Sequence, residues 1–133
     1  MFEIKIQYSE LPTISNCLNL SIKDVYNYME FEATLIIEYN NSIFFSEEVA
    51  IVEFYWYISR WYKEISSGIN KEFVYSTIEY TKPILTFSNL NDKVWVIDSL
   101  WRKSNPIAVD ETVIFEQVRN FISKVTRLLK SNV

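Results

Sequence analysis

The chain has 133 residues and a formal net charge of −4, and hydrophobic residues make up 49% and aromatic residues 17% of it. This composition excludes a disordered chain, and the length fits a single domain over residues 1–133. The chain has no histidine, one glycine and one cysteine, which excludes His-dependent nucleophiles and zinc sites, Gly-rich phosphate loops and an internal disulfide.

The first third of the chain predicts antiparallel strands. Apolar and polar side chains alternate with a period of two, which is typical of half-buried strands, and this alternation is weakest over 18–26. The predicted strands are 2–8, 18–26, 30–39 and 42–45. Because glycine is so scarce, we expect the tight turn between the last two strands to use Asn40 and Asn41, which tolerate positive φ.

The outward side of the strand at 30–39 carries three carboxylates, Glu30, Glu32 and Glu38. Residues 1–68 hold 4 Lys+Arg against 10 Asp+Glu, a charge of −6, whereas residues 69–133 hold 9 against 7, a charge of +2. The three glutamates therefore form a candidate acidic face that would attract a basic partner. The alternatives are an ordinary solvated strand face and a catalytic or metal-binding carboxylate pair.

A long amphipathic helix is predicted over 46–66. Ser46 can cap free amides at its start, the acidic Glu47 and Glu48 favour the positive end of the helix dipole, and Gly68 ends it. One stripe of large apolar side chains is expected to face the core: Ile51, Phe54, Tyr55, Ile58, Trp61, Tyr62 and Ile65.

A second, smaller stripe on this helix lies away from the core stripe. The stripe and its polar border consist of Val49, Val52, Glu53, Trp56, Tyr57 and Arg60. A tryptophan among charges is a frequent anchor of protein interfaces, so these residues form a candidate interface with a partner or with a second copy of the chain. Alternatively, the loop at 9–27 or the other helix covers this stripe within the same domain.

The second half predicts more strands and a second amphipathic helix. The predicted strands are 72–80, 84–88 and 93–101. Asp110 is expected to cap a helix that runs to Lys130. The fold class is therefore α+β, mainly antiparallel sheet with two long amphipathic helices, in the order β-β-β(β)-α-β-β-β-α. The two halves, 1–68 and 69–133, could be similar units that share one sheet.

Asp98 interrupts an otherwise apolar strand. A carboxylate on a central strand is either paired with a cation or has a raised pKa, and Lys82, Lys93 and Arg102 are the available partners. Asp98 is therefore a candidate pocket acid. The alternative is an aspartate at a strand end that is held by backbone amides.

The sequence argues against binding to membranes or nucleic acid. The first residues alternate instead of forming a leader peptide, and no apolar run approaches the ~18 residues that span a bilayer. The basic and aromatic cluster Trp101-Arg102-Lys103 is short and stands in an acidic chain. We therefore expect a soluble, cytoplasmic protein.

Three segments in the second half resemble a known kind of protein. They are Glu79-Tyr80, Pro83-Ile84-Leu85-Thr86-Phe87 and Trp95-Val96-Ile97-Asp98-Ser99-Leu100-Trp101. Together with the closing helix, they resemble the small uncharacterised bacterial α+β proteins that often serve as immunity partners of secreted toxins. The resemblance covers about residues 72–130. Those proteins share no universal motif, so it implies a role but no site residue.

Two functions remain as hypotheses, and neither needs a cofactor or a metal. The first is a non-enzymatic protein-binding module, of an immunity or inhibitor type, whose acidic residues and exposed aromatic side chains cover a basic partner. The second is a small-molecule-binding domain with an aromatic pocket near Asp98. Exposure of Val49, Val52 and Trp56 would favour the first, and a closed aromatic cavity that reaches Asp98 would favour the second.

Overall fold

The computed structural model describes residues 1–77 and 82–130. The elements in these ranges are β1 (Phe2–Gln7), a 3-10 turn (Cys17–Asn19), α1 (Ile22–Asn27), β2 (Glu32–Tyr39), β3 (Ser42–Ala50), α2 (Ile51–Ser66), β4 (Phe73–Tyr75), β5 (Leu85–Asn91), β6 (Val94–Ser99), β7 (Ile107–Asp110) and α3 (Glu111–Lys130). Within the described ranges the strands form two antiparallel sheets, ordered β1-β2-β3 and β4-β5-β6-β7. The predicted α+β class is confirmed.

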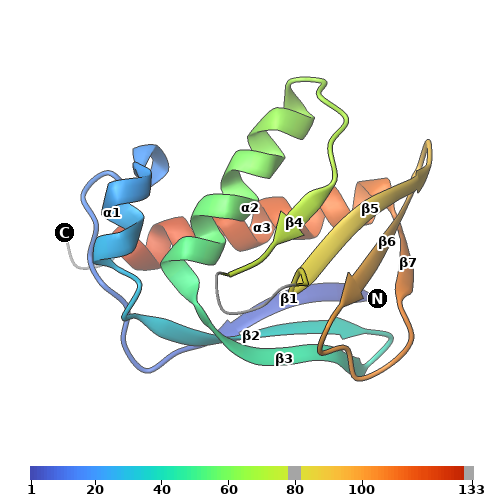
Figure 1. Cartoon of the computed structure of the whole chain (residues 1–133), viewed down its shortest axis with the longest axis horizontal. Coiled ribbons are helices and arrows are strands. Elements are labelled where there is room, and N and C mark those ends of the chain that lie inside the picture. Colours follow the sequence, from blue (N-terminus) through green and yellow to red (C-terminus); the bar gives the residue numbers. More distant parts are fainter. Residues whose placement is uncertain (78–81, 131–133) are drawn as a thin grey trace.

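The two long helices connect and cover the two sheets. In Figure 1, α3 runs behind α2 and behind the four-stranded sheet, while the three-stranded sheet lies below them. α3 contacts β1 of one sheet and β6 and β7 of the other, and α2 packs on β2, β3 and β4. The strands of residues 1–68 and those of 69–133 belong to separate sheets in the described ranges, so the idea that the two halves share one sheet is wrong.

The hairpin turn between β2 and β3 is confirmed, but the start of α2 was predicted wrongly. Asn40 and Asn41 have φ values of 52° and 66°. The strand that was expected to end at residue 45 continues to Ala50, because residues 46–50 pair with the first half of β2. Ser46 is therefore a strand residue, and the first amide of α2, that of Ile51, donates to the carbonyl of Phe31 at 3.2 Å. Pairing along the whole of β2 outweighs the local capping signal.

The weak strand expected at 18–26 is also wrong. Ser21 caps the short helix α1 with a capping box: its Oγ accepts from the amide of Asp24 at 3.2 Å, and its own amide donates to Asp24 Oδ2 at 3.1 Å. The bond from the Ser21 amide, and a second that the Ser21 hydroxyl donates to Asp24 Oδ2 at 2.9 Å, lower the pKa of the Asp24 carboxyl. The spacing of Ser21 and Asp24 was a visible signal for a helix start.

The four-stranded sheet partly follows the predictions. β5 and β6 confirm the strands expected at 84–88 and 93–101, and α3 ends at Lys130 as predicted. Asp110 Oδ1 accepts from the amide of Thr112 at 2.9 Å, as expected of a capping residue. Of the strand expected at 72–80, β4 covers Phe73–Tyr75, and residues 78–80 lie outside the described residues. Strand β7 was missed because four residues after a proline give too short an alternation.

The core is built around aromatic side chains of α2. The Phe54 ring packs edge-on against Phe73, Tyr75 and Phe121. About two turns further along the helix, the Trp61 ring contacts four others, those of Phe73, Phe87, Trp95 and Phe115. Such pairs stabilise beyond their buried area. The predicted core stripe is confirmed from Ile51 to Trp61, while Tyr62 and Ile65 are partly buried and pack against the core.

Candidate functional site

The predicted interface stripe is wrong in its first two members. Val49 is 5% exposed and Val52 is 0% exposed, so both belong to the core. Val49 lies in β3, opposite Ala33, instead of in the first turn of the helix. Because α2 begins at Ile51, Val52 occupies its first turn and points into the core. An exposed apolar seam formed by Val49, Val52 and Trp56 therefore does not exist.

The remaining four residues of the stripe do lie on one face of α2. Glu53, Trp56, Tyr57 and Arg60 follow one another at helical spacing. The Trp56 indole Nε1 donates to the carbonyl of Leu20 at 2.9 Å, so the loop before α1 covers part of this face, as one alternative predicted. The guanidinium carbon of Arg60 lies 4.8 Å from the Trp56 ring centre, a cation–π contact. Trp56 and Tyr57 stay half-buried.

An open cleft of about 320 Å³ separates this face of α2 from β4. It is lined by Trp56, Tyr57, Arg60, Trp61, Glu64, Lys71, Glu72, Phe73 and Val74. Two of these lining residues form a salt bridge: Lys71 Nζ, in the loop between α2 and β4, lies 3.3 Å from Glu64 Oε2, near the end of α2. β4 is an edge strand that pairs with β5 on one side, and its Val74 side chain is 41% exposed. We call this hollow the α2–β4 cleft.

Glu53 does not line this cleft, but it lies one helical turn before Tyr57, which does, and it is far more buried than its sequence pattern suggested. Its side chain is 9% exposed, and its Oε1 accepts from the Tyr75 hydroxyl at 3.2 Å. Burial raises the pKa of the Glu53 carboxyl, and the bond from Tyr75 only partly opposes this. Burial, followed by the charge of Glu53, also raises the pKa of Tyr57 and of Tyr75. The first turn of α2 thus holds a carboxylate in a poorly hydrated place.

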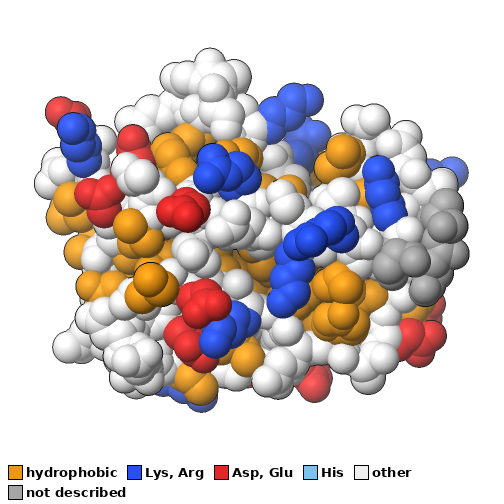
Figure 2. Space-filling model, turned by 180° about the vertical axis from the view of Figure 1, so that it is seen from behind, with side chains coloured by type: hydrophobic (Ala, Val, Ile, Leu, Met, Phe, Trp, Pro, Cys, Tyr) orange, Lys and Arg blue, Asp and Glu red, His pale blue; other side chains and the backbone are white. Residues whose placement is uncertain are grey.

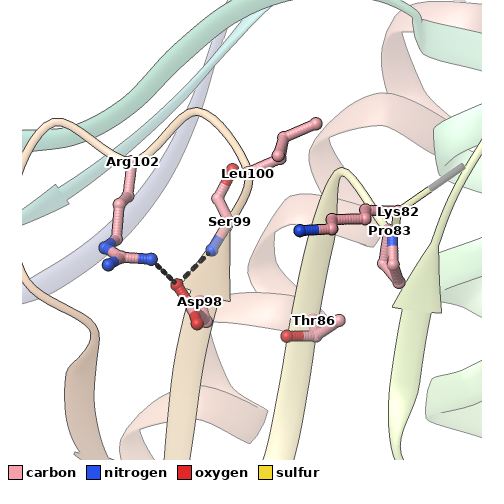
Figure 3. Close-up of a pocket in the computed structure, with 7 residues that line it drawn as sticks. All are labelled: Lys82, Pro83, Thr86, Asp98, Ser99, Leu100 and Arg102. Atoms are coloured by element: carbon pink, nitrogen blue, oxygen red, sulfur yellow. Dashed lines mark hydrogen bonds and ion pairs between the residues drawn. The ribbon is translucent and has the colours of Figure 1, made fainter. Parts of the chain in front are cut away.

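Asp98 has the opposite surroundings. Its Oδ1 accepts from Arg102 Nη1 at 3.0 Å and from the amide of Ser99 at 2.8 Å, as Figure 3 shows. The ion pair is exposed, with 44% of each side chain accessible. Arg102, one of the three expected partners, therefore neutralises Asp98 at the end of β6.

The hollow next to Asp98 is not an aromatic pocket. It measures about 340 Å³ and is lined by Lys82, Pro83, Thr86, Asp98, Ser99, Leu100 and Arg102. The Lys82 and Thr86 side chains point into the same space as Asp98 (Figure 3). None of the described residues that line it is aromatic, and it lies on the outer face of the sheet. The closed aromatic cavity that would have favoured small-molecule binding is absent at this described position.

The candidate acidic face is spread out. Glu32 and Glu38 both lie on the outer face of β2, and Glu38 accepts from Lys5 Nζ at 3.2 Å. Glu30 precedes the strand and is exposed. At roughly 3.3 Å per residue, Glu32 and Glu38 are about 20 Å apart along the strand, well beyond the reach of a paired-carboxylate mechanism. Of the predictions made for these glutamates, this spacing argues against the carboxylate pair and leaves the solvated face and the attraction of a basic partner.

The described residues show neither a metal centre nor a membrane span. Among them, no group of three or more Cys, Asp or Glu side chains could hold a metal ion. No helix in the described ranges is both long enough and apolar enough to cross a bilayer. On the side of the molecule behind α2, Figure 2 shows basic, acidic and apolar side chains intermixed.

Comparison with known proteins places the chain in a family. A family model described as "Domain of unknown function (DUF7878)" matches residues 3–131. The chain belongs to this family. No curated protein and no solved structure matches it. Because the description of the DUF7878 domain names no activity, the geometry around α2 and β4 carries the functional conclusion.

Proposed function

We propose that the chain is a non-enzymatic protein-binding module, of an inhibitor or immunity type, that takes a segment of a basic partner into the α2–β4 cleft. The observation that carries this is the meeting of half-buried Trp56 and Tyr57, Arg60 and an edge strand at one open hollow. Tryptophan, tyrosine and arginine are the residues that dominate binding energy at protein interfaces.

The edge strand favours a polypeptide over a small molecule. A strand with one unpaired side can add an extended segment of another chain, with main-chain bonds for affinity and neighbouring side-chain pockets for specificity. Among the described strands, β4 pairs with β5 alone, so it offers such a side next to the aromatic wall of α2, and Val74 on it is accessible. The described residues that line the hollow at Asp98 include neither an edge strand nor an aromatic side chain.

Charge favours a basic partner. The chain carries −4 overall. Around the cleft, the three acids Glu53, Glu64 and Glu72 outnumber the two cations Arg60 and Lys71, and of these acids Glu64 is paired with Lys71. The exposed Glu30 and Glu32 extend the negative potential beyond the cleft. Complementary charge of this kind speeds encounter with a cationic surface.

Site-specific photo-crosslinking in the native host tests this proposal. A photoreactive amino acid replaces Val74 in the cleft, and in a matched control it replaces Ser123, an exposed residue of α3. We expect a discrete adduct with one basic protein from position 74 only. Equal labelling from both positions, or an adduct with an acidic protein, would overturn the proposal, and an adduct with a second copy of the chain would replace it by homodimerisation.

The partner so identified is then purified and titrated by calorimetry. Tyr57→Ala should weaken its binding at least tenfold, because this ring lines the cleft. The matched control is Tyr62→Ala, since Tyr62 is an equally half-buried tyrosine of α2 that packs on Phe115 outside the cleft. If both variants bind like the wild type, the cleft is not the binding site.

A further inference from the structure

We infer that Glu53, together with the rings of Tyr57 and Tyr75, forms a subsite for a cationic side chain, a lysine ammonium or an arginine guanidinium of the partner. This rests on the proposed function, because it names the group that the cleft selects. The inference starts from a carboxylate that is 9% exposed and that forms no salt bridge with any residue in the described ranges.

Glu53 is incompletely bonded. Its one hydrogen-bond donor among the described residues is the Tyr75 hydroxyl, which reaches Oε1. Oε2 receives no bond from a described residue, yet it is not one of their fully enclosed unbonded polar atoms. The second oxygen therefore keeps some accessibility to solvent, and a carboxylate oxygen in that position can accept a charge-assisted bond.

No described cation neutralises Glu53. The salt bridges in the described ranges join Lys5 to Glu3 and Glu38, Lys71 to Glu64, and Arg102 to Asp98. Arg60, which shares the helix face with Glu53, is stacked on Trp56 two turns further along. A buried carboxylate is costly without a countercharge, and the positive end of the α2 dipole offsets this cost only in part. An incoming cation would remove the imbalance.

The surrounding rings suit a cation as well. The Tyr57 and Tyr75 ring centres are 6.0 Å apart and inclined at 63°, and Trp56 stands 5.1 Å from Tyr57. The faces of aromatic rings carry partial negative charge and attract ammonium and guanidinium groups. Tyr57 lines the α2–β4 cleft and also contacts Tyr75, the donor to Glu53. A segment lying along β4 can therefore direct a long basic side chain from the cleft toward Glu53.

The test uses small cations on the full chain, so that it does not depend on finding the partner. Nuclear magnetic resonance follows the Glu53 carboxyl and the Tyr57 and Tyr75 rings during titration with n-butylammonium, with n-propylguanidinium and with the neutral n-pentanol. We expect saturable shifts with at least one cation and none with the alcohol. Glu53→Gln should weaken cation binding at least tenfold, Glu53→Asp should retain part of it, and the matched control Asp98→Asn should leave it unchanged.

The outcomes separate this subsite from the function itself. No saturable shift, or equal binding by the wild type and Glu53→Gln, overturns the subsite. If the crosslinked partner binds Glu53→Gln as tightly as the wild type but loses affinity on Tyr57→Ala, the subsite fails and the proposed function stands. If the cation binds at Glu53 but no basic protein crosslinks at position 74, the subsite stands and the proposed function fails.

Discussion

The two hollows of the molecule are of similar size, about 320 and 340 Å³, yet the acids Glu53, near the first, and Asp98, within the second, differ in their surroundings. At the surface of β6, Asp98 is neutralised by Arg102 and held by a backbone amide. At the first turn of α2, Glu53 is buried and bonded only to a tyrosine hydroxyl among the described residues. The comparison shows that the burial of an acid depends on the elements that pack around it. The apolar pattern of its own segment does not decide it.

The largest expected effect concerns the floor of the α2–β4 cleft. Trp61 lines that cleft and packs against four core rings, so Trp61→Ala should lower the free energy of unfolding by about 3–5 kcal/mol. Leu100→Ala, in the wall of the Asp98 hollow, removes an exposed side chain and should change it by less than about 0.5 kcal/mol. Urea unfolding measures the free energy of unfolding of both variants. Similar losses would show that Trp61 is no more part of the core than Leu100.

The pH dependence of stability distinguishes the two acids next. Because burial raises the pKa of Glu53 above its ordinary value of 4.5, the folded state binds this proton more tightly than the unfolded state. The stability linked to Glu53 is therefore present below pH 4.5 and lost as the pH rises toward the folded pKa. Tyr57 and Tyr75, which face it, have pKa values raised above 10.0 and stay neutral in this window.

The variant Glu53→Gln removes this titration. Relative to it, the wild type should lose free energy of unfolding as the pH increases from 4.5 toward neutrality. Thermal unfolding across that range provides the measurement. The difference in free energy of unfolding between the two proteins could instead stay constant with pH, or favour the wild type at higher pH. Either result would contradict the burial of Glu53 without a countercharge.

A smaller effect is expected at Asp98. Its ion pair with Arg102 is exposed, and such pairs contribute about 0.2–1 kcal/mol. Asp98→Asn should therefore destabilise the protein by no more than this amount at neutral pH, and Arg102→Gln should match it. Chemical denaturation of both variants and of the double variant gives the coupling. A loss of several kcal/mol would contradict the description of Asp98 and Arg102 as an exposed ion pair.

The smallest effect on the fold is expected from the acidic residues away from both hollows. Glu30 and Glu32 are exposed, so changing both to lysine should leave the melting temperature nearly unchanged. With the crosslinked partner in hand, stopped-flow mixing should show slower association that depends less on salt, because steering by charge is lost. An unchanged association rate would remove these two residues from the proposed function.

Much of the fold could be predicted from periodicity, because α3, β2, β5 and β6 are long enough to show their pattern. The start of α2 could not, since Ser46 and its glutamates look like a helix cap while their pairing partner, the first half of β2, is set by tertiary structure. Strand β7 is too short to show a pattern. The missed helix α1 is different: the spacing of Ser21 and Asp24 was available and was outweighed by a weak alternation.

The site was predicted unevenly for a related reason. Asp98 pairs with Arg102, which is only four residues away in the sequence and was one of its three expected partners. The burial of Glu53 depends on Tyr75, which is 22 residues away and comes from another element. The sequence could place Glu53, Trp56, Tyr57 and Arg60 on one helix face, but it could not show that β4 would stand opposite them.

The most direct test of the contrast between the two acids is the titration of the Glu53 carboxyl carbon by nuclear magnetic resonance in the free, full-length protein. Burial without a neighbouring positive charge predicts a midpoint above 4.5 that moves downward when n-butylammonium is added. A midpoint at or below 4.5, unaffected by the added cation, would contradict both the buried, un-neutralised state of Glu53 and the cation subsite built on it.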